Sequence, residues 1–271
     1  MIGLLIPLAL WLLWFTHRYG WWRSPVSFQQ PRILMYHQIA EHQDGARFNG
    51  LRVPPSMFER QLKWLSENNW TFLTMAELIQ KKNNLPEKSV VLTFDDGYLD
   101  NLTNALPLMQ KYQACGTLYL VIDRHDNDWS TKKKKHHDSG ELAKDKKLSD
   151  QQVTELLESG CFELGGHTHS HANLHSLNPE QKIAEIKNSK DALEQTFKTE
   201  VTSFAYPFGI YTEDDVELVM QSGYSNAVTT NAGIDDLSQS LFTLRRVKIS
   251  GKDNFYAFKL RIKNGIRGLK K

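Results

Sequence analysis

From residue 33 onward, short apolar runs alternate with segments of helical periodicity. The apolar runs are rich in β-branched and aromatic residues and predict strands at 33–36, 90–94, 117–122, 162–165, 202–206, 226–229 and 243–249. Segments with apolar residues three or four positions apart predict helices at 55–69, 101–112, 149–159, 178–197 and 212–221. This repeated β-α alternation predicts a parallel sheet covered by helices, either a barrel or a doubly wound sheet.

Several helix ends carry recognisable signals. Ser56 and Ser149 stand where an N-cap hydroxyl is expected, and Pro179 occupies the first turn of its predicted helix. Gly160 and Gly223 follow helical segments, where glycine commonly ends a helix.

The N-terminus differs from the rest of the chain. Residues 1–16 are apolar and carry no charged side chain. A membrane-spanning helix needs about 20 residues, and this run reaches that length only by including His17 and Arg18. A cleaved signal peptide fits less well, because no Lys or Arg precedes the run and no A-x-A site follows it. We therefore expect residues 1–22 to be a hydrophobic membrane anchor.

The C-terminal residues 251–271 read as a basic amphipathic tail. From Lys259 to the end there are six Lys/Arg and no acid, interleaved with Leu260 and Ile262. Such a tail is expected either to lie on an anionic lipid leaflet or to be a solvated terminus. Basic residues that follow the apolar run 1–16, such as Arg18 and Arg23, favour the cytoplasmic face of the inner membrane, with the outer face as the alternative.

The composition of the chain is that of an ordinary globular protein, which fits one α/β domain over residues 31–250. The chain of 271 residues is 40% hydrophobic and 24% charged, with a formal net charge of +2. This near-neutral balance does not suggest a nucleic-acid partner. Cys115 and Cys161 lack the spacing of a zinc site and are expected to be reduced thiols.

Polar clusters follow four of the predicted strands. In parallel α/β folds, functional groups gather at the carboxyl ends of the strands, so these clusters are expected to share one edge. They are His37, the pair Asp95 and Asp96, the segment from His167 to His171, and the segment from Tyr206 to Gly209.

The residue types in these clusters suit a metal hydrolase. His167 and His171 are four positions apart, and in a helical turn they project together and can share a metal. One aspartate completes a set of two imidazoles and a carboxylate with positions left open. Asp95 and Asp96 point in different directions at a strand end, so one is expected on the metal and the other as general base.

Two of these segments resemble the polysaccharide deacetylase family, carbohydrate esterase family 4, with its NodB-homology domain. Residues 93–97 read T-F-D-D-G and residues 167–171 read H-T-H-S-H, matching the family's first two motifs. The resemblance runs from about Pro31 to Ser250. It implies a distorted (β/α) barrel with fewer than eight repeats, and a metal-dependent hydrolase, with zinc as the expected metal.

The resemblance also implies residue roles. Asp95 is the catalytic base, and the metal ligands are Asp96, His167 and His171. Residues 204–209, F-A-Y-P-F-G, resemble the third motif, in which an amide after the proline holds the oxyanion. By position that amide belongs to Phe208, and Tyr206 stands beside it as a candidate substrate-site residue.

Two departures from the usual family pattern matter. The arginine of the third motif is replaced by Ala205, and no histidine follows Phe208 to supply the general acid. Residues 34–38, L-M-Y-H-Q, are instead similar to the permuted members that include poly-N-acetylglucosamine deacetylases. That similarity implies His37 as the acid, with Arg245 or Arg246 in place of the missing arginine.

The resemblance implies removal of N-acetyl groups from sugars of a cell-envelope polysaccharide or a lipopolysaccharide precursor. One alternative is a metal hydrolase of a non-sugar amide on the same scaffold. Another is a non-catalytic glycan-binding relative, against which the intact Asp95, Asp96, His167 and His171 argue.

Overall fold

The central feature of the molecule is a parallel β-barrel. The computed structural model describes residues 2–125 and 140–268. In these ranges the sheet order is β1-β8-β7-β6-β5-β4-β3-β2, and an additional β1–β3 pairing closes every strand except β2 into the barrel. A barrel is therefore formed in preference to a doubly wound sheet. The strands are β1 (Arg32–Tyr36), β2 (Thr71–Leu73), β3 (Ser89–Asp95), β4 (Gly116–Leu120), β5 (Phe162–Gly166), β6 (Ser203–Ala205), β7 (Asn226–Ala232) and β8 (Leu244–Lys248).

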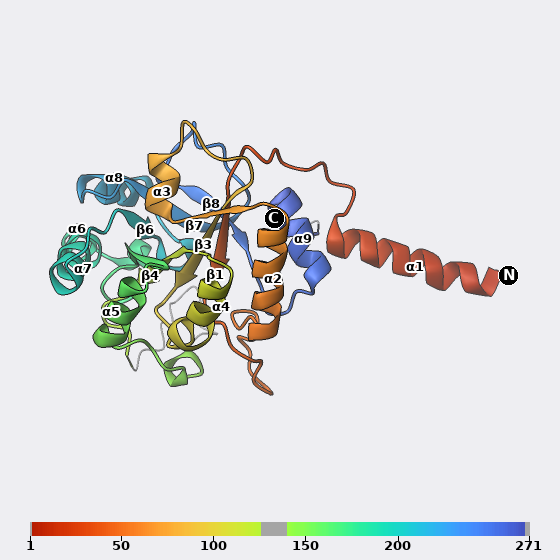
Figure 1. The fold of residues 1–271 in the computed structure, drawn as a ribbon, viewed down its shortest axis with the longest axis horizontal. Coiled ribbons are helices and arrows are strands. Elements are labelled where there is room, and N and C mark those ends of the chain that lie inside the picture. The colour runs from red at the N-terminus through yellow and green to blue at the C-terminus, as the bar shows by residue number, and fades with distance from the viewer. Residues whose placement is uncertain (1, 126–139, 269–271) are drawn as a thin grey trace.

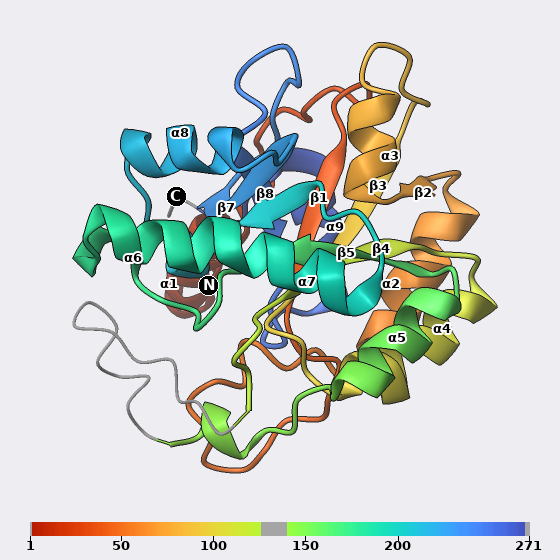
Figure 2. The same ribbon diagram turned by 90° about the vertical axis from the view of Figure 1, so that its left-hand side faces the viewer.

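Helices surround the barrel (Figures 1 and 2). The α-helices are α1 (Ile2–Tyr19), α2 (Pro55–Glu67), α3 (Met75–Gln80), α4 (Leu106–Lys111), α5 (Asp150–Glu158), α6 (Pro179–Ile183), α7 (Ser189–Phe197), α8 (Glu213–Gln221) and α9 (Phe255–Asn264). Two π-helical segments, η1 (Asn101–Ala105) and η5 (Ala184–Asn188), continue directly into α4 and α7. Short 3₁₀ turns are η3 (Leu142–Lys144), η4 (Leu174–Ser176) and η6 (Pro207–Gly209).

Every predicted strand and helix is present, with ends shifted by a few residues, while β2, α3 and α9 were not predicted. Ser149 caps α5 as expected, because its side chain accepts a hydrogen bond from the Gln152 amide in a capping box. The prediction for Ser56 was wrong. Pro54 is the N-cap of α2 and no side chain caps that end, so Ser56 lies inside the first turn.

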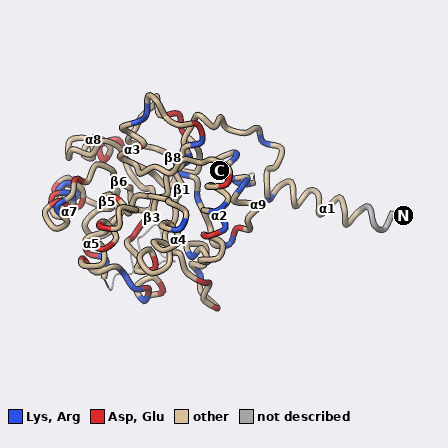
Figure 3. The backbone as a smooth tube through the Cα atoms, viewed as in Figure 1, with Lys and Arg blue, Asp and Glu red and all other residues tan. Residues whose placement is uncertain are grey.

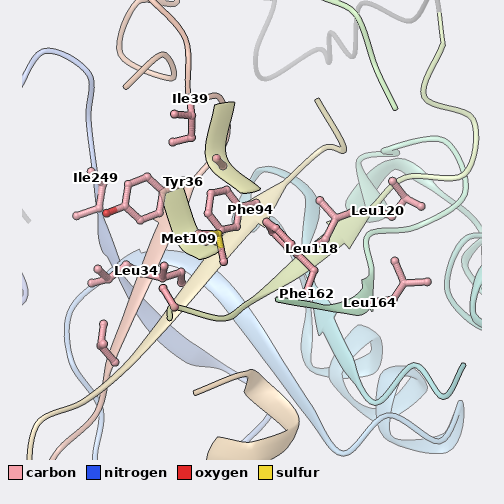
Figure 4. Packing of buried hydrophobic residues seen from close by; sticks show 14 of the residues in the cluster. Leu34, Tyr36, Ile39, Phe94, Met109, Leu118, Leu120, Phe162, Leu164 and Ile249 are labelled. Atoms are coloured by element: carbon pink, nitrogen blue, oxygen red, sulfur yellow. The ribbon is translucent and has the colours of Figure 1, made fainter. Parts of the chain in front are cut away.

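The core explains why the strands read as continuous apolar runs. All residues of β1, β3 and β4 are buried, since helices cover one face and the barrel interior covers the other. Figure 4 shows Leu34, Tyr36 and Phe94 packed together, and the Tyr36 and Phe94 rings stack with centroids 5.5 Å apart. The Tyr36 hydroxyl donates to Gln61 Oε1 at 2.8 Å, which satisfies its buried polar atom.

Barrel closure brings distant parts of the chain to one edge. Leu34 of β1 pairs with Leu92 of β3 on one side and with Val247 of β8 on the other. The carboxyl ends of these three strands therefore lie together. His37, Asp95 and Lys248, which follow or end them, all line one pocket.

Helix α1 projects away from the barrel (Figure 1), and charged residues are almost absent along it (Figure 3). Its base is docked, since Phe15 and Tyr19 contact the Tyr256 ring with centroids 5.9 and 5.3 Å apart. No helix in the described part of the chain is long and apolar enough to cross a membrane. Beyond the base, its large apolar side chains are exposed: Ile6, Leu8, Leu10, Trp11, Leu12, Leu13 and Trp14.

The prediction that the C-terminal segment lies on lipid with its apolar residues is wrong for Leu260 and Ile262. Leu260 and Ile262 are only 6% and 1% exposed, because α9 packs its apolar residues onto the body. Asn254 caps this helix by accepting a hydrogen bond from the Ala257 amide at 2.9 Å. Leu260 and Ile262 therefore pack in the protein interior and do not face lipid.

Candidate active site

Asp95 ends β3 and is held by an arginine from the far end of the domain. Arg246 Nη1 and Nη2 each donate to one Asp95 carboxylate oxygen at 2.7 Å. The same guanidinium donates to Thr93 Oγ1 at 3.0 Å and to the Thr229 carbonyl at 2.9 Å. Arg246 is fully buried and Asp95 is 2% exposed. A bidentate pair fixed in this way sets both the orientation and the charge of the carboxylate.

The charge state of Asp95 follows from its surroundings. Burial by itself raises the pKa of a carboxyl group, but the charge and hydrogen bonds of Arg246 outweigh burial and hold the pKa of Asp95 below its usual value. Asp95 is therefore an ionised carboxylate at neutral pH and can accept a proton. Arg246 occupies the role for which two candidates were open.

Arg245, the other candidate, does not reach this site. Neighbouring residues of a strand point to opposite faces, so Arg245 points outward when Arg246 points into the barrel. It is paired with Asp235, and its side chain is 48% exposed. The expectation for Arg245 is corrected in favour of Arg246.

Asp96, His167 and His171 form a cluster that can hold a metal. One ligand atom from each residue lies within 4.8 Å of the others, and all three residues are buried. His167 Nε2 and His171 Nε2 lie 3.4 and 3.5 Å from Asp96 Oδ1. His167 Nδ1 is 2.7 Å from the Ala205 carbonyl, and donation to that oxygen leaves Nε2 to face a metal. Burial lowers the pKa of His171 to about 3, so its ring is neutral, the form that binds a metal.

The loop that carries the two histidines is not the helical turn expected from their spacing. Thr168 and His171 adopt left-handed backbone conformations, with φ of 65° and 57°. Asp96 does the same at 80°, so strained residues gather around the proposed metal. Glu185 of η5 steadies the loop, accepting hydrogen bonds from the His169 and Ser170 amides at 3.0 and 2.9 Å. The two rings therefore converge through loop geometry, with their centroids 4.8 Å apart.

His37, the expected acid, lines the same pocket as the Asp96, His167 and His171 cluster. It follows β1 directly, and its Nε2 is 3.9 Å from Asp95 Oδ2. Its side chain is 17% exposed, so the ring is available to a substrate in the pocket. The barrel places His37 and Asp95 close to each other although they come from different strands.

The third motif forms a tight turn next to the metal ligands. Phe208 has φ of 58°, and its ring packs on His171 with centroids 4.4 Å apart. Thr230 Oγ1 donates to the Phe208 carbonyl at 3.1 Å. A Cβ at position 209 would meet Thr230 Oγ1 at 2.0 Å, so the turn requires Gly209. Tyr206, the N-cap residue of this turn, is fully buried, and its ring stacks on Tyr211.

These groups line a pocket of about 230 Å³. Five lining residues were not predicted from sequence: Met35, Leu51, Leu142, Thr230 and Lys248. Strand alternation gave a signal for Lys248, because it stands two positions after Arg246 and so shares its face. Leu51 comes from a loop and Leu142 from the short 3₁₀ turn η3, and segments this short carry no periodic pattern.

Comparisons with known proteins identify relatives of this chain. The family model described as "Polysaccharide deacetylase" matches residues 82–227. The Bacillus subtilis (strain 168) protein YxkH, named for that family, is 32% identical over 221 residues, covering 80% of this chain and 71% of its own. A poly-beta-1,6-N-acetyl-D-glucosamine N-deacetylase of Staphylococcus aureus is 27% identical over 184 residues, covering 63% of this chain and 58% of that enzyme.

A solved structure shows the same architecture. The Streptococcus pyogenes deacetylase PplD, in complex with acetate, matches with a TM-score of 0.70 and 27% identity. The match covers 84% of this chain and 95% of that one. The chain belongs to the polysaccharide deacetylase family.

Proposed function

We propose that this protein is a metal-dependent deacetylase that hydrolyses the N-acetyl group of N-acetylated sugars in a cell-envelope glycan. One observation carries the proposal. The cluster of Asp96, His167 and His171 shares a single pocket with His37 and with Asp95, which the buried Arg246 holds from behind the pocket lining. Family membership and the named N-acetylglucosamine deacetylase of Staphylococcus aureus support the sugar amide as substrate.

The donor set fits a divalent metal. Two imidazoles and one carboxylate suit zinc, and they leave positions open for water and substrate. A metal held by Asp96, His167 and His171 supplies Lewis-acid activation of water and of the acetyl carbonyl.

The chain's own residues divide the remaining chemistry. Asp95 takes a proton from the attacking water, and Arg246 keeps Asp95 ionised for that step. The Phe208 amide, set by the turn at φ of 58°, donates to the oxyanion as the carbonyl becomes tetrahedral. Protonated His37 then donates to the leaving nitrogen as the C–N bond breaks. The products are acetate and a free amino sugar.

The N-terminal helix suggests attachment to a membrane. The exposed apolar side chains of α1, including Trp11 and Trp14, suit burial in lipid, and no acidic residue precedes Glu41. Arg18 and Arg23 after the apolar run favour the cytoplasmic face of the inner membrane, where the substrate would be a membrane-linked glycan precursor. Alkaline phosphatase and a fluorescent protein fused in turn to the C-terminus test this placement. Active phosphatase with a dark fluorescent fusion would place the domain outside.

Acetate release tests the activity. The purified protein, loaded with zinc, is incubated with N-acetylglucosamine oligomers and, separately, with an N-acetyllysine peptide. Release from the oligomers that stops on chelation supports the proposal. Release from the peptide alone would indicate a non-sugar amidase, and oligomer binding without release would indicate a glycan-binding relative.

A further inference from the structure

The loop that carries His37 is held by side chains of a different segment. After β1 ends at Tyr36, residues 37–39 leave the sheet ladder, and their backbone groups need other partners. Asp100 Oδ1 accepts a hydrogen bond from the Ile39 amide at 2.7 Å. Asn101 Nδ2 donates to the His37 carbonyl at 2.9 Å, and Asn104 Nδ2 donates to the Ile39 carbonyl at 2.7 Å.

These three residues form one unit, which we call the η1 clamp: Asp100, Asn101 and Asn104. Asn101 Nδ2 also donates to Asp100 Oδ1 at 3.1 Å, which joins two of the three residues directly, and Asn104 shares Ile39 with Asp100 as a partner. Asn101 is fully buried. Asn101 and Asn104 belong to the π-helical segment η1, and asparagine is a poor helix former, which indicates that these side chains serve contacts outside the helix.

The clamp links the His37 loop to the segment that carries Asp95 and Asp96. It begins four positions after Asp96, so the segment that carries the base and a metal ligand also grips the loop that carries His37. On its other side, that loop is joined to the segment around Leu51, because the Gln38 amide donates to the Leu51 carbonyl at 3.1 Å. The backbone of the His37 loop is thus held from two directions. In this position His37 Nε2 lies 3.9 Å from Asp95 Oδ2.

We propose that Asp100, Asn101 and Asn104 are positioning residues that hold His37 where it protonates the leaving nitrogen. The inference rests on the proposed acid role of His37. Asn101 fixes the carbonyl of His37 itself, and the other two fix both polar groups of Ile39. General acid catalysis depends on placing the donor within hydrogen-bond reach of its target, and a small displacement of a catalytic group costs up to about 10²-fold in rate.

Asn101→Ala and Asn104→Ala test the clamp in the zinc-loaded protein. Each is expected to lower kcat for an N-acetyl sugar amide by about 10- to 100-fold, with KM and metal content unchanged. An activated acetyl ester should lose far less, because its leaving group departs without a proton. Asn68→Ala is the matched control. Asn68 Nδ2 makes the same kind of bond, to the Trp64 carbonyl at 2.8 Å, but on α2 and away from the pocket.

A double variant separates positioning from general weakening of the fold. If the clamp acts through His37, adding Asn101→Ala to His37→Ala should cost no further amide activity. Additive losses, or equal losses on amide and ester, would overturn the proposal. Asn104→Ala in the same background gives the same test if Asn101→Ala does not fold.

The outcome also separates this inference from the proposed function. If His37→Ala itself spares the amide reaction, then His37 is not the acid, and both the clamp and that part of the mechanism are wrong. If His37→Ala is selective for the amide while both asparagine variants behave like the wild type, only the clamp is wrong.

Discussion

The two sides of the pocket are built differently. The metal side, made of Asp96, His167 and His171, comes from the loops after β3 and β5 and depends on left-handed backbone at several residues. The proton-transfer side joins His37 after β1 to Arg246 in β8, near the two ends of the domain. These two meet at Asp95 only because β1 pairs with both β3 and β8. The metal cluster thus depends on the conformation of two loops. The proton-transfer residues are brought together by the strand pairings that close the barrel.

The largest effect is expected from breaking the metal side. His171→Ala should remove the metal and lower activity on amide and ester alike by more than about 10³-fold, because a bound metal contributes several kcal/mol to the barrier. His169→Ala is the control, since His169 is exposed and lies between the two ligands in sequence. Metal content by mass spectrometry and acetate release decide the outcome. Full metal occupancy in His171→Ala would show that the ligand set is wrong.

Removing Arg246 should break the proton-transfer side while the metal stays bound. Arg246→Ala leaves Asp95 buried without its partner, so its pKa rises and the base becomes protonated at neutral pH. We expect kcat/KM to fall by about 10²–10³-fold, with its acid limb moved to higher pH. The loss in stability should be about 3–5 kcal/mol, the usual cost of breaking a buried ion pair.

Arg245→Ala is the matched control for Arg246→Ala. Arg245 is the neighbouring residue on β8, and its ion pair with Asp235 is exposed. The free energy of unfolding should change by less than about 1 kcal/mol and activity should not change. A pH profile of Arg246→Ala that matches the wild type would contradict the assigned role of Arg246.

A smaller effect on the metal side is expected from the loop support. Glu185→Ala removes the acceptor for the His169 and Ser170 amides, which frees the loop between the ligands. Metal affinity should fall by about 10-fold, the lower end for residues that support metal ligands. Titration calorimetry with zinc measures the effect, and Glu180→Ala, in the exposed first turn of α6, is the control. Unchanged zinc affinity would mean that the loop holds its shape without Glu185.

Asp100→Asn should change the pH dependence of stability with little change in activity, because the amide oxygen still accepts from Ile39. Burial raises the pKa of Asp100 from 3.8 to about 7, so the folded state binds its proton more tightly than the unfolded state. The stability from this proton is present below pH 4 and is lost as the pH rises toward 7. Between pH 5 and 8, the wild type should lose about 2–3 kcal/mol relative to the variant. Denaturant unfolding of both proteins at pH 5 and pH 8 measures this difference. An unfolding free-energy difference between wild type and variant that is the same at both pH values would contradict the raised pKa.

The sequence predicted more of the metal side than of the proton-transfer side. The family resemblance of the T-F-D-D-G and H-T-H-S-H segments, each continuous along the chain, implied Asp96, His167 and His171 as ligands without a structure. Spacing alone left open which of Asp95 and Asp96 binds the metal. Strand alternation places Arg245 and Arg246 on opposite faces of β8. It does not say which face points into the barrel, because that depends on the pairing register of the strand. Asp100 contacts Ile39 across 61 positions of sequence, and Glu185 contacts the His169 amide across 16. Both separations exceed the period of a helix or strand, so no local pattern records these contacts.

The fold shows the same division. Strands and helices with strong periodicity were predicted, including the N-cap at Ser149. Helix α9 was not, because a basic amphipathic segment has the same pattern whether it faces lipid or packs on a protein core. The barrel, in turn, depends on the β1–β3 pairing, which periodicity does not specify.

The separate roles of the metal side and the proton-transfer side are tested most directly with His37→Ala. Its rates of amide and ester hydrolysis are measured at full zinc occupancy. We predict that hydrolysis of an N-acetyl sugar amide falls by about 10²–10⁴-fold, the usual value of general acid catalysis. An activated acetyl ester should lose less than about 10-fold, because the metal and Asp95 still act on it. Equal losses on the two substrates, or loss of zinc from the variant, would contradict an acid that serves the leaving nitrogen alone.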